Sequence, residues 1–438
     1  MTQSPPLWLA LVLAAAGTAA VGAGAAFAQA AVEPAPSLLP PGVFVAPRTE
    51  VPWVVAVFAL PVDGPPPEAW LLSALLEEPD IWRGSDVGAL LDGGGRLEIK
   101  SGPEGILVVA EGPSSQEAQV YRAAFALLSG SLDERKPDGA TLGRAQARAL
   151  RRRALDGGDS GRLARDALWR AWFGPHTPGR ALVLNEMQVI RADLSALEAL
   201  RTGLARAPDP ALFIEGRFTQ ASLAEAASRL AARTAPPLMA RAVVPGPSRI
   251  SLRHKGAPPR LLLAHPLPPS PELDGPFGAA LLEAIRPAVG PLGASVELSH
   301  QRGATLLIFD VPLGERTADE VEAALKAALE GLRREPPLSK ALAPLLARAR
   351  AEEASRRAEI GGAALGRARR YLRFGSAGGD EGTPEALRER LRWVLLPEAL
   401  RSVWVDSAAV PGEGDAPPQK VPPSSEAEPT PAGDRGAL

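Results

Sequence analysis

The side chains that could carry out metal or nucleophilic chemistry are few in this chain of 438 residues. It contains no cysteine, so thiolate nucleophiles, disulfides and sulfur-ligated zinc sites are excluded. The four histidines are His176, His254, His265 and His300, and no two lie three or four residues apart, as paired imidazole ligands on one helix would. His254 and His265 fall on successive strand patterns that could meet across a sheet. Without a nearby acid they form an incomplete metal site, so we expect structural roles for them.

Two other patterns could bind charged groups. The segment DGGGRLE at 92–98 is rich in glycine but lacks the lysine and serine of a phosphate-binding loop, so it predicts a turn. One face of a predicted helix carries Arg144, Arg148 and Arg151 or Arg152. We favour the interpretation that this face is solvated; the alternative is a positive stripe that binds an anionic partner. The chain has 48 Lys and Arg against 50 Asp and Glu, which excludes the basic excess typical of nucleic-acid-binding proteins.

Both ends of the chain are expected to lie outside the folded part. Leu7 to Ala28 is apolar and uncharged and ends in an A-x-A pattern, which is typical of a signal peptide over residues 1–30. A retained membrane anchor is the alternative, because the run is long enough to span a bilayer. Cleavage would leave a periplasmic or secreted protein without a membrane span. Residues 407–438 are rich in Pro, Gly, Ser and Glu, which predicts a disordered tail.

The first half of the folded part, residues 41–235, combines strand and helix patterns. Val51 to Val62 is a continuous apolar and β-branched run, which is typical of a buried strand. A helical pattern follows at 68–78, then two short strands on either side of Gly102–Gly105, then an amphipathic helix ending near Gly130. The remaining predicted elements are a long helical region at 141–173, a helix at 194–204, a strand at ALFIEGRF and a helix at 220–232.

The second half, residues 248–406, repeats this order after a Pro-rich linker at 236–247. Two strands separated by a turn are followed by a helix at FGAALLEAIRPA, a hairpin at VELSHQRGATLLIFDVP, an amphipathic helix at DEVEAALKAALEGLRR and a closing strand at LRSVWVD. A repeat of about 190 residues is too long for a solenoid unit. The sequence therefore predicts an α+β protein made of two homologous domains.

The order of these elements resembles the insulinase, pitrilysin and mitochondrial processing peptidase family, the inverted zinc metallopeptidases. The most telling segment is WFGPHTPGR at 172–180, which is similar to a bacterial segment after that family's long helix, and the strand ALFIEGRFT follows it. In the second half, GAPPRLLLAHPLPP is similar to the family's opening strand. The resemblance covers residues 41 to about 406 and implies two metallopeptidase-like domains, each a mainly antiparallel sheet packed with helices.

The sequence departs from this family at the catalytic motif. Active members carry H-x-x-E-H on the first helix, where two histidines hold zinc and the glutamate activates water. The matching run here is PEAWLLSAL, which places Trp70 and Ala74 at the histidines and Ser73 at the glutamate. The family's third ligand, a later glutamate, would fall at 150–153, where LRRR holds no acid.

A shift of register would bring Glu77 and Glu78 into the motif, but no imidazole occurs in the first 175 residues. The resemblance therefore implies a degenerate first domain without zinc, without another cofactor and without catalytic residues. We expect the chain not to be an enzyme, although it would support the peptidase activity of a partner.

Members of this family act as two-part chambers in which one part carries zinc and an empty part helps to grip the peptide. The resemblance implies that this chain is the empty part of a heterodimer with a zinc-bearing paralogue. Arg286 matches an arginine that often holds the substrate backbone, but the tyrosine that accompanies it is absent between Gly290 and Val296. The alternative is a stand-alone binding or scaffold protein of the cell envelope with no role in proteolysis.

Overall fold

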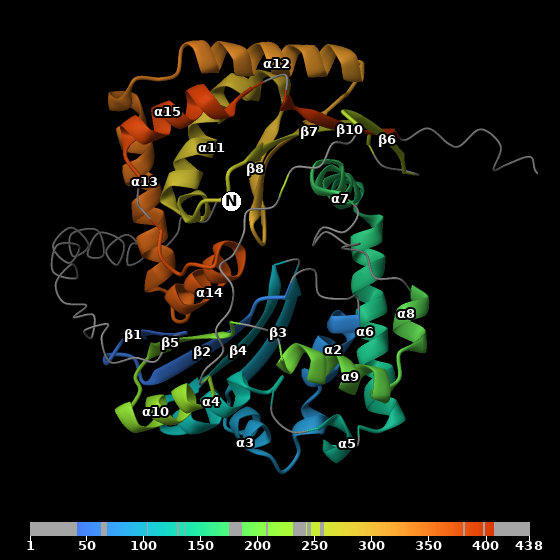
Figure 1. Ribbon diagram of the computed structural model, residues 1–438, viewed down its shortest axis with the longest axis vertical. Coiled ribbons are helices and arrows are strands. Elements are labelled where there is room, and N and C mark those ends of the chain that lie inside the picture. Colours follow the sequence, from blue (N-terminus) through green and yellow to red (C-terminus); the bar gives the residue numbers. More distant parts are fainter. Residues whose placement is uncertain are drawn as a thin grey trace, which may run out of the picture.

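A computed structural model describes the chain at residues 42–62, 68–102, 104–128, 131–135, 137–174, 186–206, 209–230, 242, 247–254, 258–379, 382–396 and 399–406. Within these residues, each half forms one five-stranded sheet flanked by helices (Figure 1). The strand order is β1-β5-β2-β4-β3 in the first sheet and β6-β10-β7-β9-β8 in the second. Every strand thus has a counterpart at the same place in the other half, which confirms an α+β fold with two similar halves.

The first sheet is organised around β2 (Trp53–Leu60), in which every residue after Trp53 is buried. A strand covered on both faces is apolar at successive positions, which explains the unbroken run in the sequence. Strand β2 pairs antiparallel with β4 (Gly105–Pro113) and with β5 (Ala211–Gly216). The edges are β3 (Arg96–Gly102), antiparallel to β4, and β1 (Val43–Pro47), parallel to β5.

The second sheet has the same pairings. Its strands are β6 (Arg249–Arg253), β7 (Arg260–Leu267), β8 (Ser295–Gln301), β9 (Ala304–Pro312) and β10 (Arg401–Asp406). Because β10 lies between β6 and β7, His254 and His265 do not meet across neighbouring strands, contrary to one reading of the sequence. The edge strand β1 is not evident from its sequence, because VFVAP is short and mostly only half-buried.

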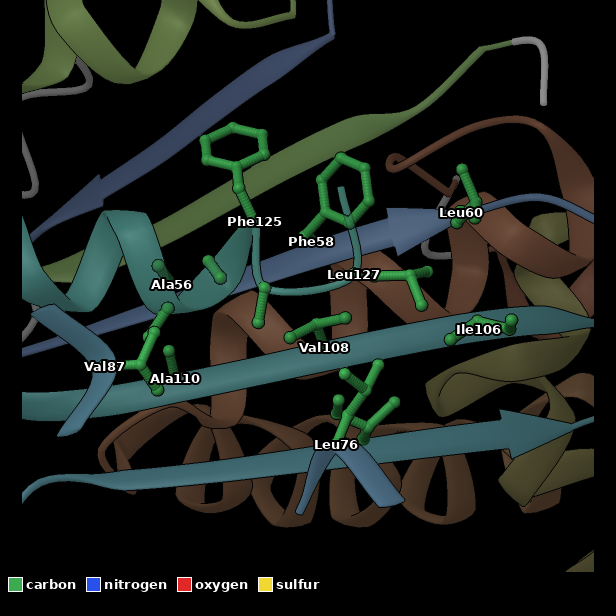
Figure 2. Close-up of a cluster of buried hydrophobic side chains, with 14 of the residues drawn as sticks. Ala56, Phe58, Leu60, Leu76, Val87, Ile106, Val108, Ala110, Phe125 and Leu127 are labelled. Atoms are coloured by element: carbon green, nitrogen blue, oxygen red, sulfur yellow. The ribbon is translucent and has the colours of Figure 1, made fainter. Parts of the chain in front are cut away.

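The core of the first half lies between its sheet and the helices on one face. Phe58, Val108 and Ala110 of β2 and β4 meet Phe125 and Leu127, which follow α4, and the ring centroids of Phe58 and Phe125 are 5.2 Å apart (Figure 2). The helices of this half are α2 (Glu68–Leu76), α3 (Asp86–Asp92), α4 (Glu117–Ala124), α5 (Leu132–Arg135), α6 (Gly139–Gly158), α7 (Ser160–Phe173), α8 (Glu186–Arg191), α9 (Leu194–Ala205) and α10 (Gln220–Ser228).

The second half carries more helix than its sequence pattern predicts. Its helices are the short η4 (Pro271–Asp274), then α11 (Pro276–Val289), α12 (Ala318–Arg334), α13 (Ser339–Ala358), α14 (Gly362–Phe374) and α15 (Pro384–Val394). The last three stand between the expected amphipathic helix and the closing strand. Helix α13 is hard to recognise because only Leu342, Leu346 and Ala349 of its twenty residues are buried, so its apolar stripe is narrow.

Each sheet is covered on its second face by a helix from the other half (Figure 1). Helix α7 packs Leu168, Trp169 and Trp172 against β7, β9 and β10 of the second sheet. Helix α14 packs Ala364 and Leu372 against β2 and β5 of the first sheet. The two halves therefore exchange a helix, and neither sheet is covered on both faces by its own half alone.

This exchange explains why the helical region expected at 141–173 is two helices. Helix α6 ends at Gly158, and the side chain of Asp159 caps α7 by accepting a hydrogen bond from the backbone N–H of Arg162 (3.1 Å). The first helix stays on its own half and the second crosses to the other.

Several expectations concern residues outside those described, namely the signal peptide at 1–30, most of the linker at 236–247 and the tail at 407–438. Among the helices that are described, none is both long and apolar enough to cross a bilayer.

Candidate functional site

Helix α2 places the three residues that the sequence resemblance aligned with the catalytic motif along one wall of a cavity. Trp70, Ser73 and Ala74 line this space of about 360 Å³, together with Glu77 just beyond the helix. Residues three and four apart lie on one face of a helix, so these side chains share the same surroundings. We refer to this space as the α2 cavity.

The other walls come from β3 and α6. The edge strand β3 contributes Glu98 to Ser101, and α6 contributes Arg148, Ala149 and Arg152. The segment at 150–153, which was expected to hold a third metal ligand, thus does reach the cavity, but the side chain that lines the cavity is the guanidinium of Arg152. The β3 residues carry no motif in the sequence and join the site only because β3 lies beside α2.

The Ser73 hydroxyl is held within the wall. It donates a hydrogen bond to the carbonyl of Ala69 (2.7 Å), and its oxygen lies 2.7 Å from the hydroxyl oxygen of Ser101. Ser73 is 6 % exposed, and both of its partners are neutral oxygen groups. A serine nucleophile needs an adjacent base to take its proton, so Ser73 in this arrangement is structural.

Trp70 and Arg152 face each other at the cavity. The guanidinium carbon of Arg152 lies 5.2 Å from the centroid of the Trp70 ring, which is within cation–π range. An indole offers only a hydrogen-bond donor, and an arginine stays charged at any ordinary pH. This pair therefore disfavours a metal cation in this part of the cavity.

Glu78 joins α6 to the end of α2. Its carboxylate oxygens lie 2.9 Å from Nε of Arg144 and 2.6 Å from Nη2 of Arg148. Arg148 also donates to the carbonyl of Ala74, and Arg144 lies 2.5 Å from a carboxylate oxygen of Asp80. We expected these arginines to form a solvated face. Arg144 and Arg148 are indeed half exposed, but they also hold α6 against α2 and the turn that follows α2.

Glu77 covers part of the free edge of β3. Its Oε1 accepts a hydrogen bond from the backbone N–H of Ile99 (2.8 Å). Burial raises the pKa of Glu77, while the Ile99 hydrogen bond and Arg148 partly oppose that shift. This hydrogen bond ties Oε1 of Glu77 to the strand. Lys100, Arg148 and Arg152 line the cavity together with Glu77 and Glu98, so it presents charges of both signs.

Within the described ranges, no group of three or more His, Asp or Glu side chains is arranged to hold a metal ion. His254, His265 and His300 all lie in the second half, on or beside β6, β7 and β8. His176 and most of the WFGPHTPGR segment lie outside the described residues.

Arg286, the arginine expected to hold a peptide, is not among the residues that line the α2 cavity. It lies near the end of α11, where its side chain is 56 % exposed and forms an ion pair with Glu283 one turn earlier. The structure therefore does not bring Arg286 together with Trp70, Ser73 and Ala74.

Comparison by sequence finds no matching family model and no matching curated protein. Comparison by structure finds M16-like peptidases, the insulinase family. A putative M16-like peptidase from Alicyclobacillus acidocaldarius matches with a TM-score of 0.61 and 14 % identity, covering 83 % of this chain and 95 % of that one. A peptidase M16 inactive domain from Pseudomonas fluorescens matches with a TM-score of 0.62 and 14 % identity, covering 84 % and 95 %.

A longer protein matches over part of its length. The ferredoxin protease FusC, solved in complex with Arabidopsis ferredoxin, matches with a TM-score of 0.56 and 13 % identity, covering 82 % of this chain and 43 % of FusC. These likenesses concern the fold, and at that level they confirm the resemblance inferred from the sequence.

Proposed function

We propose that this chain is a non-catalytic M16-like subunit that pairs with a zinc-bearing relative and forms part of a peptide-binding chamber. The observation that carries the proposal is the composition of the α2 cavity. An indole, a hydroxyl and a methyl group stand on α2 at the positions that the sequence resemblance aligns with the catalytic motif, and Arg152 of α6 lies over the indole.

The chemistry of these groups supports a binding role. Zinc in hydrolases needs imidazole or carboxylate ligands and an open position for water. Arg152 brings a positive charge to this space instead, and the only carboxylates among the described residues that line it are Glu77, bonded to Ile99, and Glu98, which lies 3.0 Å from Lys100. The likeness to an M16 inactive domain and to part of FusC is consistent with an empty unit that works beside another one.

The signal-like segment before the fold supports a periplasmic or secreted location for this subunit. A stand-alone envelope scaffold with the same fold is the competing function. It would keep the α2 cavity without any partner that carries zinc.

The experiment mixes the purified full chain with zinc-bearing M16-like proteins encoded in the same organism. Sedimentation measures association, and a quenched-fluorescence peptide library measures cleavage. We expect the chain alone to bind no stoichiometric zinc and to cleave no peptide, and we expect a defined complex and increased cleavage after mixing.

Matched variants test the part played by the cavity. Arg152→Glu, in the cavity, is expected to raise the KM of the complex for peptide, whereas Arg348→Glu, on the exposed side of α13, is expected to leave it unchanged. A chain that remains monomeric with every candidate favours the scaffold. Stoichiometric zinc and cleavage by the chain alone would contradict both non-catalytic functions.

A further inference from the structure

A second cavity lies where the two halves meet, apart from the α2 cavity. It has a volume of about 510 Å³ and is bordered by the segment after β1, the start of α11, and helices α13 and α14. The α2 cavity is lined by β3, and β1 and β3 are the opposite edges of the first sheet (Figure 1). We call this second space the junction cavity.

The junction cavity is lined by more positive than negative side chains. Among the described residues that border it, five are arginines and two, Glu272 and Glu353, are acidic. The arginines are Arg48, Arg350, Arg357, Arg367 and Arg370. They come from both halves, although the whole chain has a net charge of −2.

One acidic side chain in this space, Glu353, forms ion pairs with several arginines at once. Glu353 lies 3.0 Å from Nε of Arg357, 3.0 Å from Nη2 of Arg370 and 3.1 Å from Nη2 of Arg356. Arg48 lies 2.9 Å from the buried Glu215 and donates to the carbonyl of Ala358 at the end of α13. One carboxylate shared among three guanidinium groups leaves a local excess of positive charge.

Arg370 shows the effect of this crowding most clearly. Its side chain is only 8 % exposed, and its buried Nε has no hydrogen-bond partner in the structure. Burial lowers the pKa of Arg370, and neighbouring Arg357 lowers it further. Nη2 of Arg370 is paired with Glu353, but a buried N–H without an acceptor is costly, and an oxyanion within reach of Nε would relieve that cost.

The start of α11 adds a second favourable feature. Gly275 and Pro276 line the cavity, and the helix begins without a side-chain cap. The first backbone N–H groups of a helix and its dipole favour an anion at this end. This end of a fourteen-residue helix therefore acts in the same direction as the arginines.

We infer that the junction cavity binds a soluble ligand carrying phosphoryl groups, and that this ligand connects the two halves. Guanidinium groups from three separate elements suit a tetrahedral oxyanion with several oxygens, whereas one arginine already satisfies a planar carboxylate in a bidentate pair. A volume of about 510 Å³ suits a small ligand rather than a nucleic-acid strand, which requires an extended basic surface. This site is independent of the proposed pairing and of the α2 cavity.

The test is calorimetric titration of the full chain with pyrophosphate, inorganic phosphate and citrate at constant ionic strength. We expect saturable binding of pyrophosphate, weaker binding of phosphate, and the weakest binding of citrate. No saturable binding of either phosphate compound would overturn the inference, and so would citrate binding as tightly as pyrophosphate.

Two exposed arginines of α13 provide a matched comparison. Arg357 and Arg348 each pair with a glutamate one turn away, Glu353 and Glu352, but only Arg357 lines the cavity. Arg357→Gln is expected to raise the Kd for pyrophosphate about tenfold, equivalent to about 1.4 kcal/mol, and Arg348→Gln to leave it unchanged. Thermal denaturation without ligand checks that both variants fold. Equal weakening by both substitutions would show general charge attraction and would overturn the site.

Discussion

At the scale of single residues, Glu215 illustrates how one buried charge joins the two halves. It lies in β5 and is 1 % exposed. Its Oε1 lies 2.9 Å from Nε of Arg48, and its Oε2 accepts a hydrogen bond from the backbone N–H of Ala364 (2.9 Å) in the first turn of α14. A carboxylate from the first half thus caps a helix that belongs to the second half.

Glu215→Ala is expected to lower the free energy of unfolding by about 3 kcal/mol, because it leaves a partly buried guanidinium and a helix N–H without their acceptor. Glu215→Gln retains an acceptor and should cost less. Urea denaturation measures both. Glu352→Gln, which removes an exposed pair with Arg348, is the control and should change stability by less than about 1 kcal/mol. Equal effects of Glu215→Ala and Glu352→Gln would show that Glu215 does not hold α14.

The assignment of the α2 cavity can be tested by restoring ligands at the residue level. We expect the triple variant Trp70→His, Ala74→His and Arg152→Glu to bind one zinc ion, because these three positions line the same cavity. Metal analysis and the rise of Tm with added zinc measure it. The double variant without Arg152→Glu is the control and should bind zinc more weakly. A folded triple variant that does not bind zinc would contradict the equivalence of this cavity with a metal site.

At the scale of elements, the exchanged helix α14 depends on how it begins. Gly361 precedes it with a φ of +79°, a conformation that favours glycine, and a Cβ there would lie 3.2 Å from Cγ1 of Val55 in β2. A side chain at this position would both strain the backbone and press on the sheet that α14 covers.

Gly361→Ala is therefore expected to destabilise the protein by about 1–2 kcal/mol. Gly366→Ala, inside the same helix, is the matched control. Nothing lies within 4 Å of a Cβ at Gly366, so alanine there should stabilise the helix by up to about 1 kcal/mol. Chemical denaturation of both variants distinguishes these opposite signs, and a neutral Gly361→Ala would show that the start of α14 tolerates another backbone conformation.

At the scale of the whole molecule, a buried ionic network connects the halves beside α14. Arg373 of α14 lies 2.5 Å from Oδ1 of Asp274 in η4 and 3.3 Å from Oε1 of Glu104 in the β3–β4 turn. His300 of β8 lies beside them, with its Nε2 4.0 Å from Asp274 and its Nδ1 3.1 Å from the hydroxyl of Thr305. Burial, and secondly Arg373, lower the pKa of His300 to about 3, and burial raises the pKa of Asp274.

These shifts predict how stability depends on pH. In the unfolded state His300 is protonated below its ordinary pKa of 6.5, whereas in the folded state it stays neutral down to about pH 3. Because the unfolded state binds more protons in this range, the free energy of unfolding falls as the pH falls from 6.5 to about 3. Asp274 acts with the opposite sign, because its folded form accepts a proton first. When the pH is lowered from 7.5 to 4.5, the decrease in unfolding free energy is expected to be about 2–3 kcal/mol smaller for His300→Gln than for the unaltered chain. Asp274→Asn should steepen the loss, and parallel pH profiles for all three proteins would contradict this account.

Much of the fold could be predicted from local patterns. The unbroken apolar run of β2, the hairpin on either side of Gly102–Gly105 and the repeated order of elements in the second half are all present. The edge strand β1 and helix α13 escaped prediction because each buries few of its residues, so neither shows a strong periodic signal.

The candidate site could be predicted only in part. Trp70, Ser73 and Ala74 were expected at one site from the resemblance, and the structure places them on one wall of the cavity. Arg152 lies in the 150–153 segment that the resemblance placed at the third ligand, and this segment does line the cavity. Lys100 lines it only because β3 packs beside α2, and no local pattern indicates that packing. Arg286 follows only from the resemblance, and it lies outside this cavity.

The sequence by itself determined the duplicated α+β order and the lack of imidazole near the first helix, because both are properties of composition and spacing along the chain. Only the tertiary structure decided that α7 packs on the second sheet and α14 on the first. It also decided that five arginines line one cavity where the halves meet. The reason is physical. The hydrophobic effect is non-directional, so the apolar face of a helix can be buried against either sheet. Charges that are distant in sequence interact only when folding brings them close together in space.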